Sequence, residues 1–350
     1  MISLIIPVTT SNSNYTNNLV RNIRDLYPNE DEVEIILEIN DEVTLGMNYN
    51  NAVARAKGEK IILLHNDMVL SKGFVETMDK HISKRVITTY TRIEPPIYMD
   101  TYPGKVIKDC GSDLGTFDEK LFNQIQLEES LIDGGSQLFF GCYKEDYIGI
   151  DGYTFKKFCE DDDLHLRYKL TGFEHKVSSA HVYHFVSKTS RTGNYQNVEL
   201  RSNKDFVRKW GSRNPSVKYN IAYVVQNCQL PALETLELFC DRIYVNERFN
   251  IGRMWDYVEL EQENTSFDLS KRVLTIENND PVAENDIVVE FDLLKFNPES
   301  FNILQQLPQI IKESGEPGTF ELDIFKITIN SMPEYQNDLI FISKQHDETN

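Results

Sequence analysis

The amino-acid sequence predicts an α/β fold, in which a sheet flanked by helices is followed by a second, smaller α/β domain. The aliphatic run at residues 61–64 has the composition of a strand that is buried on both faces, and the runs at 2–8 and 33–39 predict two further strands. The intervening stretches 15–27 and 46–56 carry apolar residues at helical spacing. Strands and helices that alternate in this way build a parallel sheet with right-handed crossovers.

Each of these strands is followed by polar residues that we expect along one rim of the sheet. The run at 61–67 is the clearest case, because its aliphatic residues end abruptly at His65, Asn66 and Asp67. The other two strands end at Pro7, Val8 and Thr9 and at residues 38–41. Ligands of open α/β sheets bind at the carboxyl ends of the strands. An Asn-Asp pair is also common in turns, so the rim alone does not define a site.

The rest of the first half continues this alternation around one irregular stretch. We predict helices at 74–82, 143–148 and 158–172, and strands at 86–93, 138–142 and 178–185. Residues 94–117 contain three prolines and follow no regular period. A stretch of this length without secondary structure is typical of a functional loop.

Four consecutive acids, Glu160 to Asp163, lie at the start of the predicted helix 158–172. Carboxylates are favoured there because they cap free N–H groups and interact well with the helix dipole. Capping needs only one or two acids, so we expect at least one of the four carboxylates to point into a cleft. The predicted strand 178–185 contributes two histidines, His181 and His184, to the same half of the chain.

Composition restricts the partners and the compartment. The net charge of −19 argues against a protein that binds nucleic acid or an anionic membrane, because both need a basic surface. The five cysteines are scattered without C-x-x-C spacing, which predicts neither disulfides nor a zinc knuckle and fits a reducing compartment. The sequence shows no signal peptide and no run of about 18 apolar residues. We therefore expect a cytoplasmic protein without a membrane span.

Six short motifs follow one another along residues 1–215. They are I-I-P at 5–7, G-M-N-Y-N-N-A-V-A-R-A-K-G-E-K at 46–60, L-H-N-D at 64–67, G-I-D-G-Y at 149–153 with E-D-D-D-L-H-L-R at 160–167, A-H-V-Y-H at 180–184, and K-W-G at 209–211. In this order and spacing they resemble the family 2 glycosyltransferases. That resemblance implies a GT-A (Rossmann-like) mixed sheet flanked by helices over residues 1–215. Residues 216–350 would then form a carboxy-terminal α/β accessory domain.

The resemblance implies an inverting transfer of a hexosyl or related sugar from a nucleoside-diphosphate-sugar donor, with a UDP-sugar expected, to an acceptor hydroxyl. The leaving diphosphate then needs a divalent cation, and the acceptor hydroxyl needs a base. By resemblance Asp67 and His184 are the metal ligands. Mn²⁺ is expected rather than Mg²⁺ because an imidazole joins the carboxylate. Asp161 is the expected general base, and Glu160 orients it or contacts the acceptor.

The resemblance also implies a donor site and several structural roles. The substrate-binding residues that it assigns are Pro7, Val8, Thr9, Glu38, Asn40, Gly46, Asn50 and Asn66. Asp163 and Arg167 are expected to pair and to hold their helix in place. The alternation of strand faces assigns His184 to the metal and His181 to a half-buried face. Trp210 is expected to pack beneath the last helix of the domain.

Two departures from the family pattern leave an alternative open. His65 replaces the first acid of D-x-D, which could weaken metal binding, and Tyr49 stands where an arginine often precedes Asn50. The alternative is a non-catalytic module that binds nucleotide sugars or carbohydrate within a larger assembly. A nucleotidyltransferase is disfavoured, because residues 9–14 contain neither the glycine nor the lysine of its signature.

The second half of the chain repeats the strand and helix signals. We predict strands at 219–226, 241–246, 271–277, 286–291 and 319–329, and helices at 232–239 and 301–314. No G-x-G-x-x-G follows the first of these strands, so the sequence predicts no phosphate cradle there. Packing against the catalytic domain, acceptor binding and self-association into a homo-oligomer are the expected roles. Glycan, lipid-linked and protein acceptors all remain open.

Overall fold

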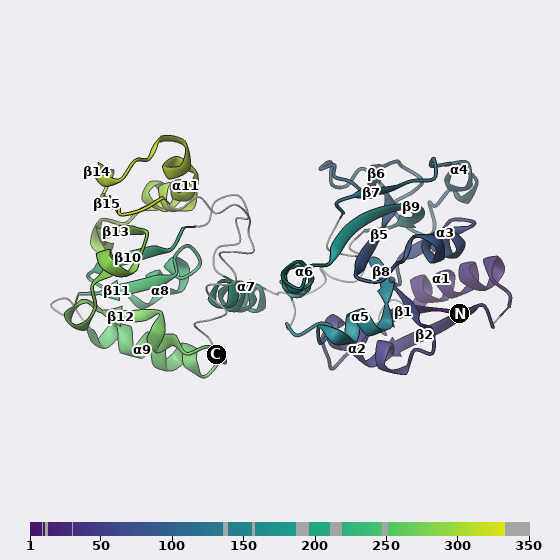
Figure 1. Cartoon of the computed structure of the whole chain (residues 1–350), viewed down its shortest axis with the longest axis horizontal. Coiled ribbons are helices and arrows are strands. Elements are labelled where there is room, and N and C mark those ends of the chain that lie inside the picture. Colours follow the sequence, from purple (N-terminus) through teal and green to yellow (C-terminus); the bar gives the residue numbers. More distant parts are fainter. Residues whose placement is uncertain are drawn as a thin grey trace. The chain divides into compact units, whose positions relative to one another are not determined.

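A computed structural model describes residues 1–8, 10, 13–29, 31–135, 139–155, 158–186, 196–210, 219–246 and 251–332. Thr9, Gly211 and the carboxy-terminal residues after 332 lie outside this set. The chain divides into two compact units, Met1–Glu199 and Leu200–Asn350, which are described separately below (Figure 1).

The first unit is built on one mixed sheet. Its strands lie in the order β2 (Val33–Ile39), β1 (Ile2–Val8), β3 (Lys60–Leu63), β8 (Phe140–Tyr143), β5 (Val86–Glu94), β9 (Glu174–His184) and β4 (Met68–Leu70), with β6 (Lys105–Ile107) paired to β5 and β7 (Leu131–Asp133) paired to β9. Strands β2, β1 and β3 are parallel, as are β5 and β9. Strand β8 is antiparallel to β3 and β5, and β4 is antiparallel to β9. This mixture arises because β8 and β4 enter the sheet without a crossover helix.

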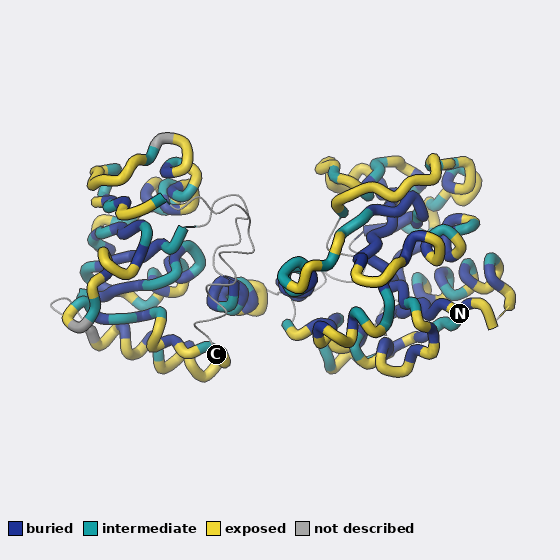
Figure 2. Tube along the Cα trace, viewed as in Figure 1, coloured by how far each residue is buried: buried dark blue, intermediate teal, exposed yellow. Residues whose placement is uncertain are grey.

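Helices cover both faces of this sheet. They are α1 (Ser13–Leu26), α2 (Leu45–Arg55), α3 (Phe74–His81), α4 (Glu119–Asn123), α5 (Lys144–Gly149) and α6 (Glu160–Leu170). Along β1, Leu4 and Ile6 pack into the core formed with α1 and α3, whereas Ile5 packs into the core formed with α2, α5 and α6. Successive side chains of a strand point to opposite faces, so a strand covered on both sides is apolar throughout. Figure 2 shows the central strands in the dark blue of buried residues, whereas the helices alternate between buried and exposed. The predicted α/β class is thereby confirmed.

The registers of the strands create the predicted rim. Pro7 lies opposite Glu38 in the parallel pair of β1 and β2, and Ile5 lies opposite Leu63 in the pair of β1 and β3. The chain then leaves the middle of the sheet after Leu64 and returns at its edge as β4, where Met68 pairs with His184. The predicted strand over the aliphatic run 61–64 corresponds to β3, and the polar residues His65 to Asp67 follow it as expected. Residues 65–67 form a link between two strands of one sheet.

The second unit contains a smaller sheet in the order β12 (Val273–Thr275), β11 (Arg242–Val245), β10 (Ile221–Gln226), β13 (Ile287–Asp292), β15 (Phe325–Ile329) and β14 (Gly318–Leu322). The first four strands are parallel, and β15 is antiparallel to both of its neighbours. The described helices are α8 (Leu230–Leu236), α9 (Ile251–Gln262), α10 (Pro281–Glu284) and α11 (Pro298–Ser314), with short 3-10 turns η2 (Leu269–Lys271), η3 (Ile276–Asn278) and η4 (Leu293–Lys295). The predicted strand 319–329 is a hairpin, because Asp323 adopts a left-handed conformation with φ of 54°.

Helix α7 (Gln196–Trp210) crosses the boundary between the units, which the sequence placed after residue 215. Within the second unit, the guanidinium of Arg208 forms ion pairs with Glu237 at 2.6 Å and with Glu261 at 3.0 Å, and all three side chains are buried or nearly so. Residues 200–210 therefore belong to the second unit. The sequence alone does not show that these distant acids are partners of this helix. Trp210 is 1% exposed, as expected for a packed residue.

Among the residues that the structure describes, no helix combines the length and the apolar composition that crossing a bilayer requires.

A histidine pair ties α6 to β9 and makes the first unit sensitive to acid. The rings of His165 and His175 lie 4.2 Å apart, centroid to centroid. Burial, followed by the neighbouring imidazole of His175, lowers the pKa of His165 to about 3, and burial lowers the pKa of His175 to about 4. Both rings are thus neutral in the folded protein at a pH where the unfolded chain takes up protons.

We expect this pair to destabilise the fold as the pH falls below about 6.5. The unfolded state binds more protons there, so the free energy of unfolding decreases by about 1.4 kcal/mol per pH unit for each histidine. Between pH 7.5 and 5.5 the pair then contributes a loss of about 2 to 3 kcal/mol. Urea unfolding across this range measures the effect. His175→Phe should flatten the profile, and an unchanged profile in that variant would contradict the assignment.

Candidate metal centre and active site

Three side chains from the link 65–67 and the end of β9 converge at the rim of the larger sheet. His65, Asp67 and His184 each offer a ligand atom, and these atoms all lie within 4.8 Å of one another. His184 Nε2 is 3.5 Å from Asp67 Oδ1, and both side chains are buried. The return of the chain from β3 to β4 brings Asp67 next to His184. Asp67 and His184, the predicted metal ligands, are therefore neighbours in space.

Glu94, at the end of β5, fixes the His184 ring through the nitrogen that faces away from Asp67. His184 Nδ1 lies 2.8 Å from Glu94 Oε1 and donates to it, which leaves Nε2 facing Asp67. Burial lowers the pKa of His184, but the charges of Asp67 and Glu94 more than offset this and raise it overall. Histidines that bind metals typically donate their other N–H to a carboxylate, which fixes the tautomer and the ring orientation.

Two buried cations keep Glu94 ionised. Arg92 Nη1 and Lys105 Nζ each lie 3.6 Å from a carboxylate oxygen of Glu94. Burial alone would raise the pKa of Glu94, but the hydrogen bond from His184 and the charge of Arg92 hold it below its usual value. Lys105 is held in turn by Asp100 at 3.0 Å. Residues 94–117, predicted as irregular, thus contain the short strand β6, which begins at Lys105 and pairs with β5 next to Glu94.

His65, which departs from the acidic D-x-D pattern in the sequence, completes the group. Burial lowers the pKa of His65 to about 4, so its ring is neutral and keeps a lone pair. Phe139 packs edge-to-face on the ring with centroids 4.4 Å apart, and Tyr49 lies parallel to it at 6.4 Å. A neutral imidazole is a common metal ligand. The presence of an imidazole in the L-H-N-D motif is therefore the sequence feature from which His65 could have been predicted as a metal ligand.

The donor set fits a divalent transition metal. Two imidazoles and one carboxylate suit such ions better than they suit Mg²⁺ or Ca²⁺, which prefer oxygen ligands alone. The Glu94 carboxylate behind His184 is the outer partner that such a site requires. The residues present are thus consistent with a bound cation.

We expect Glu94→Gln to lower the affinity for Mn²⁺ by about tenfold to a hundredfold. The glutamine still accepts a hydrogen bond from His184 but no longer adds negative charge. It also removes the Glu94 carboxylate that lies 3.6 Å from Arg92 and from Lys105. Calorimetric titration with Mn²⁺ measures the change. Glu129→Gln, an exposed carboxylate 3.9 Å from His81, is the matched control. Equal affinity in the two variants would rule out the proposed role of Glu94.

Asp161 lies in the first turn of α6 and accepts a hydrogen bond from a buried tyrosine. Tyr153 donates its hydroxyl to Asp161 Oδ1 at 3.1 Å. Burial raises the pKa of Asp161 well above its usual value, and the nearby charge of Glu160 raises it further. Phe158 and Cys159, directly before the helix, both have left-handed backbone conformations, with φ of 65° and 59°. Strain of this kind is found where a particular side-chain direction is enforced.

Asp163, two positions further along the run, serves the structure. Asp163 pairs with Arg167 at 2.9 Å and accepts a hydrogen bond from Thr154, as the sequence predicted for the ion pair. The guanidinium of Arg167 also donates to the carbonyl oxygens of Ile150 and Gly152. This network fastens the 150–154 turn, and with it Tyr153, to the start of α6.

Tyr49 connects the metal centre with Asp161. Its ring stacks with that of Tyr153 at 5.5 Å as well as with that of His65, and its hydroxyl donates to the carbonyl oxygen of Leu64. The pKa of Tyr49 is raised by burial and also by the charges of Asp161 and Asp67, among others. The group of His65, Asp67 and His184 and the carboxyl of Asp161 therefore belong to one site. The sequence did not indicate that Tyr49 lies between them.

Asn50 and Gly46, two residues of the predicted donor site, contact the tyrosines next to Tyr49. Asn50 Oδ1 accepts from Tyr147 Oη at 2.7 Å and from Tyr153 N at 3.0 Å, while its Nδ2 donates to the Tyr153 carbonyl. A Cβ on Gly46 would lie 2.7 Å from Tyr153 Cβ, so only glycine permits this approach. Contacts of these two residues with a ligand stay a prediction.

The remaining predicted substrate-binding residues line the rim. Pro7 and Val8 end β1 and are buried. Glu38 forms an ion pair with Arg55, Asn40 Oδ1 accepts from Glu42 N at 2.9 Å, and Asn66 donates to Thr16 at 3.1 Å. Thr9 lies outside the described residues. Their roles toward a ligand also stay predictions.

His181 faces away from the metal centre. Its ring packs edge-to-face on Phe122 at 5.9 Å, and its Nδ1 lies 3.3 Å from the carbonyl oxygen of Ser179. It is half-buried, whereas His184, three positions along β9, belongs to the metal-ligand group. His181 thus lies on a half-buried face, apart from the group that contains His184. The metal role of His184 stays a prediction.

No family model matches this chain, and no curated protein matches its sequence. Among solved structures, the chain is similar to GalNAc-T7 crystallised with UDP, GalNAc and Mn²⁺, with a TM-score of 0.42 and 11% identity over 60% of this chain and 48% of that one. It is also similar to residues 1–349 of S. aureus TarS, with a TM-score of 0.36 and 14% identity over 52% of this chain and 60% of that one. The chain thus spans about half of the first structure and three fifths of the second. Both TM-scores are below 0.5, so neither structure assigns a function to this chain.

Proposed function

We propose that this chain is a metal-dependent glycosyltransferase of GT-A type that moves a sugar, with inversion, from a nucleoside-diphosphate-sugar to an acceptor hydroxyl. One observation carries the proposal. The possible metal ligands His65, Asp67 and His184 lie in the same site as Asp161, whose pKa is raised, and this site is at the rim where the parallel strands end. This pair of features meets both needs of the reaction, a cation for the leaving group and a base for the acceptor.

In this proposal His65, Asp67 and His184 hold the cation, with Mn²⁺ favoured over Mg²⁺ because imidazoles contribute two of the three ligands. When bound, the cation neutralises charge that develops on the leaving diphosphate. Glu94 keeps His184 in the tautomer whose Nε2 faces the site. Asn66 and the ends of β1 and β2 would contact the nucleotide, for which uridine diphosphate is our choice.

Asp161 acts as the general base in this proposal. A raised pKa strengthens a carboxylate as a proton acceptor, since catalysis is most efficient when the pKa of the base approaches the working pH. The hydroxyl of Tyr153 fixes one oxygen of Asp161 and leaves the other for the acceptor. Glu160, which is buried beside it, raises its basicity by like-charge repulsion.

Release of nucleoside diphosphate tests this function. The full-length chain would be incubated with UDP-glucose, UDP-galactose or UDP-N-acetylglucosamine, with and without Mn²⁺, in the presence of a simple alkyl glycoside. We expect metal-dependent release of UDP from at least one donor, abolished by EDTA, and a product whose anomeric configuration, read by NMR, is opposite to that of the donor. Retention of configuration would contradict the inverting mechanism.

A further inference from the structure

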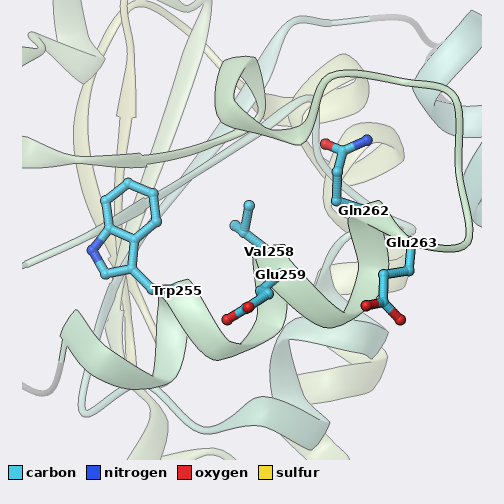
Figure 3. A pocket seen from close by; sticks show the side chains of 5 residues that line it. All are labelled: Trp255, Val258, Glu259, Gln262 and Glu263. Atoms are coloured by element: carbon cyan, nitrogen blue, oxygen red, sulfur yellow. The ribbon is translucent and has the colours of Figure 1, made fainter.

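The outward face of α9 carries an unusual set of side chains for a surface helix. A concavity of about 480 Å³ is lined by Trp255, Val258, Glu259 and Gln262 of α9 and by Glu263, which directly follows the helix. They follow one another at helical spacing, opposite the buried residues Met254, Tyr257 and Glu261. Figure 3 shows Trp255 and Gln262 towards the two ends of this stripe, with Val258 between them. The concavity is shallow and open, so it offers a surface on which a ligand can lie and not an enclosed pocket.

The aromatic wall of the concavity is exposed. The chain has two tryptophans; Trp210 is 1% exposed, whereas Trp255 is 51% exposed. A single exposed apolar side chain is ordinary on a protein surface. An indole beside a concavity, with a half-buried valine as its floor, instead offers a flat apolar platform that a ligand ring can cover.

The polar groups around the platform are acceptors and carry no positive charge. The carboxylates of Glu259 and Glu263 are exposed, and within the described part of the chain neither has a hydrogen bond or an ion pair. Gln262 is fixed, because its Nε2 donates to the Phe267 carbonyl at 2.8 Å and its Oε1 accepts from Leu269 N at 3.0 Å. None of the described residues that line the concavity is a cation, which disfavours a phosphate or a nucleotide. The carboxylates instead suit a ligand whose rim carries O–H donors.

We propose that this stripe of α9 binds a neutral sugar ring, with the apolar face of the ring on Trp255 and its hydroxyls donating to Glu259 and Glu263. A quaternary ammonium group is a poorer fit, because cages for such cations surround them with several aromatic walls and this concavity has one. The proposal goes beyond glycosyl transfer and does not depend on it. It makes the second unit a glycan-binding part of the protein.

Tryptophan fluorescence of the full-length chain tests this proposal directly. The buried Trp210 already emits from an apolar environment, so a change on titration reports Trp255. The probes are chitotriose, cellotriose and maltotriose, added in EDTA without nucleotide. We expect a blue shift with at least one of them, confirmed by calorimetry. Trp255→Ala should weaken binding about tenfold, in line with aromatic stacking energies, and Glu259→Gln and Glu263→Gln should each weaken it severalfold.

Leu260→Ala is the matched control, because Leu260 is 59% exposed on the same helix but does not line the concavity. It should bind like the unaltered chain. The proposal is overturned if none of the three trisaccharides binds, if Trp255→Ala binds them as tightly as the unaltered chain, or if trilysine or tetramethylammonium shifts the emission and the sugars do not. Because EDTA removes any metal-dependent donor site from the experiment, failure of the glycosyltransferase proposal would leave this result unchanged.

Discussion

Asp161→Asn is expected to lower kcat by about 10² to 10⁴ while the Kd for the donor stays within about twofold, because a positioned general base contributes about that much to a proton-transfer step. Asparagine keeps the acceptor oxygen that Tyr153 contacts but cannot take up the proton of the acceptor hydroxyl. In the unaltered chain the rate of the proposed reaction should fall as the pH is lowered through the raised pKa of Asp161. Steady-state kinetics and donor calorimetry on the same preparations separate the two quantities.

The same substitution should stabilise the fold at neutral pH. The pKa of Asp161 is raised in the folded protein, so the folded state holds a proton over a range above pH 3.8 where the unfolded chain has released it. Asp161 therefore lowers the free energy of unfolding as the pH rises through that range. An amide has no such penalty, and the thermal midpoint of Asp161→Asn at pH 7 should exceed that of the unaltered chain.

Asp162→Asn is the control for both effects, since it makes the same chemical change at the next position of the helix. It should retain most of the activity. If Asp162→Asn lost as much turnover as Asp161→Asn, the base would have been wrongly assigned. If Asp161→Asn turned over normally, the site would need another proton acceptor.

Asp67→Ala is expected to lower the affinity for Mn²⁺ by more than about a hundredfold and to abolish metal-dependent donor binding. The substitution removes the only carboxylate of the ligand group and leaves two imidazoles, which satisfy too few positions of a divalent ion. Calorimetric titration with Mn²⁺ measures the loss. Asp67→Asn, which keeps the shape of the side chain, separates loss of the ligand charge from a packing defect.

Asp79→Ala is a suitable control for this second prediction, because Asp79 is an exposed acid that pairs with Lys60 at 2.8 Å and lies outside the ligand group. It should bind Mn²⁺ like the unaltered chain. Unchanged metal affinity in both Asp67 variants would remove Asp67 from the site.

The sheet and its rim could be predicted because each depends on local patterns. The apolar strands 2–8 and 33–39 and the helices after them are recognisable from spacing alone, and parallel pairing then places Pro7 and Glu38 on one edge. The return of the chain as strand β4 directly after Asp67 could not be predicted. A run of four aliphatics does not reveal that the chain leaves one strand and enters another at the edge of the same sheet.

The side chains that hold the candidate metal ligands in place could not be predicted from the sequence either. Glu94 and His184 are 90 residues apart, and their hydrogen bond exists because β5 and β9 are neighbours in the sheet. Tyr49 looked like the loss of a cation, whereas its ring contacts both His65 and Tyr153. Such pairings depend on tertiary packing, which the periodicity of a sequence does not report. Helix α9 was missed because its outward face carries Trp255 and Leu260, which obscures its amphipathic period.

Calorimetric titration of the full-length chain with UDP, GDP and dTDP, each with and without Mn²⁺, tests the central claim most directly. We predict that one of these nucleotides, UDP by our proposal, binds only when Mn²⁺ is present, and that Asp67→Ala loses this binding. Metal-independent binding of UDP would contradict a role for His65, Asp67 and His184 in holding the diphosphate. No binding of any of the three to the folded protein would contradict the glycosyltransferase proposal itself.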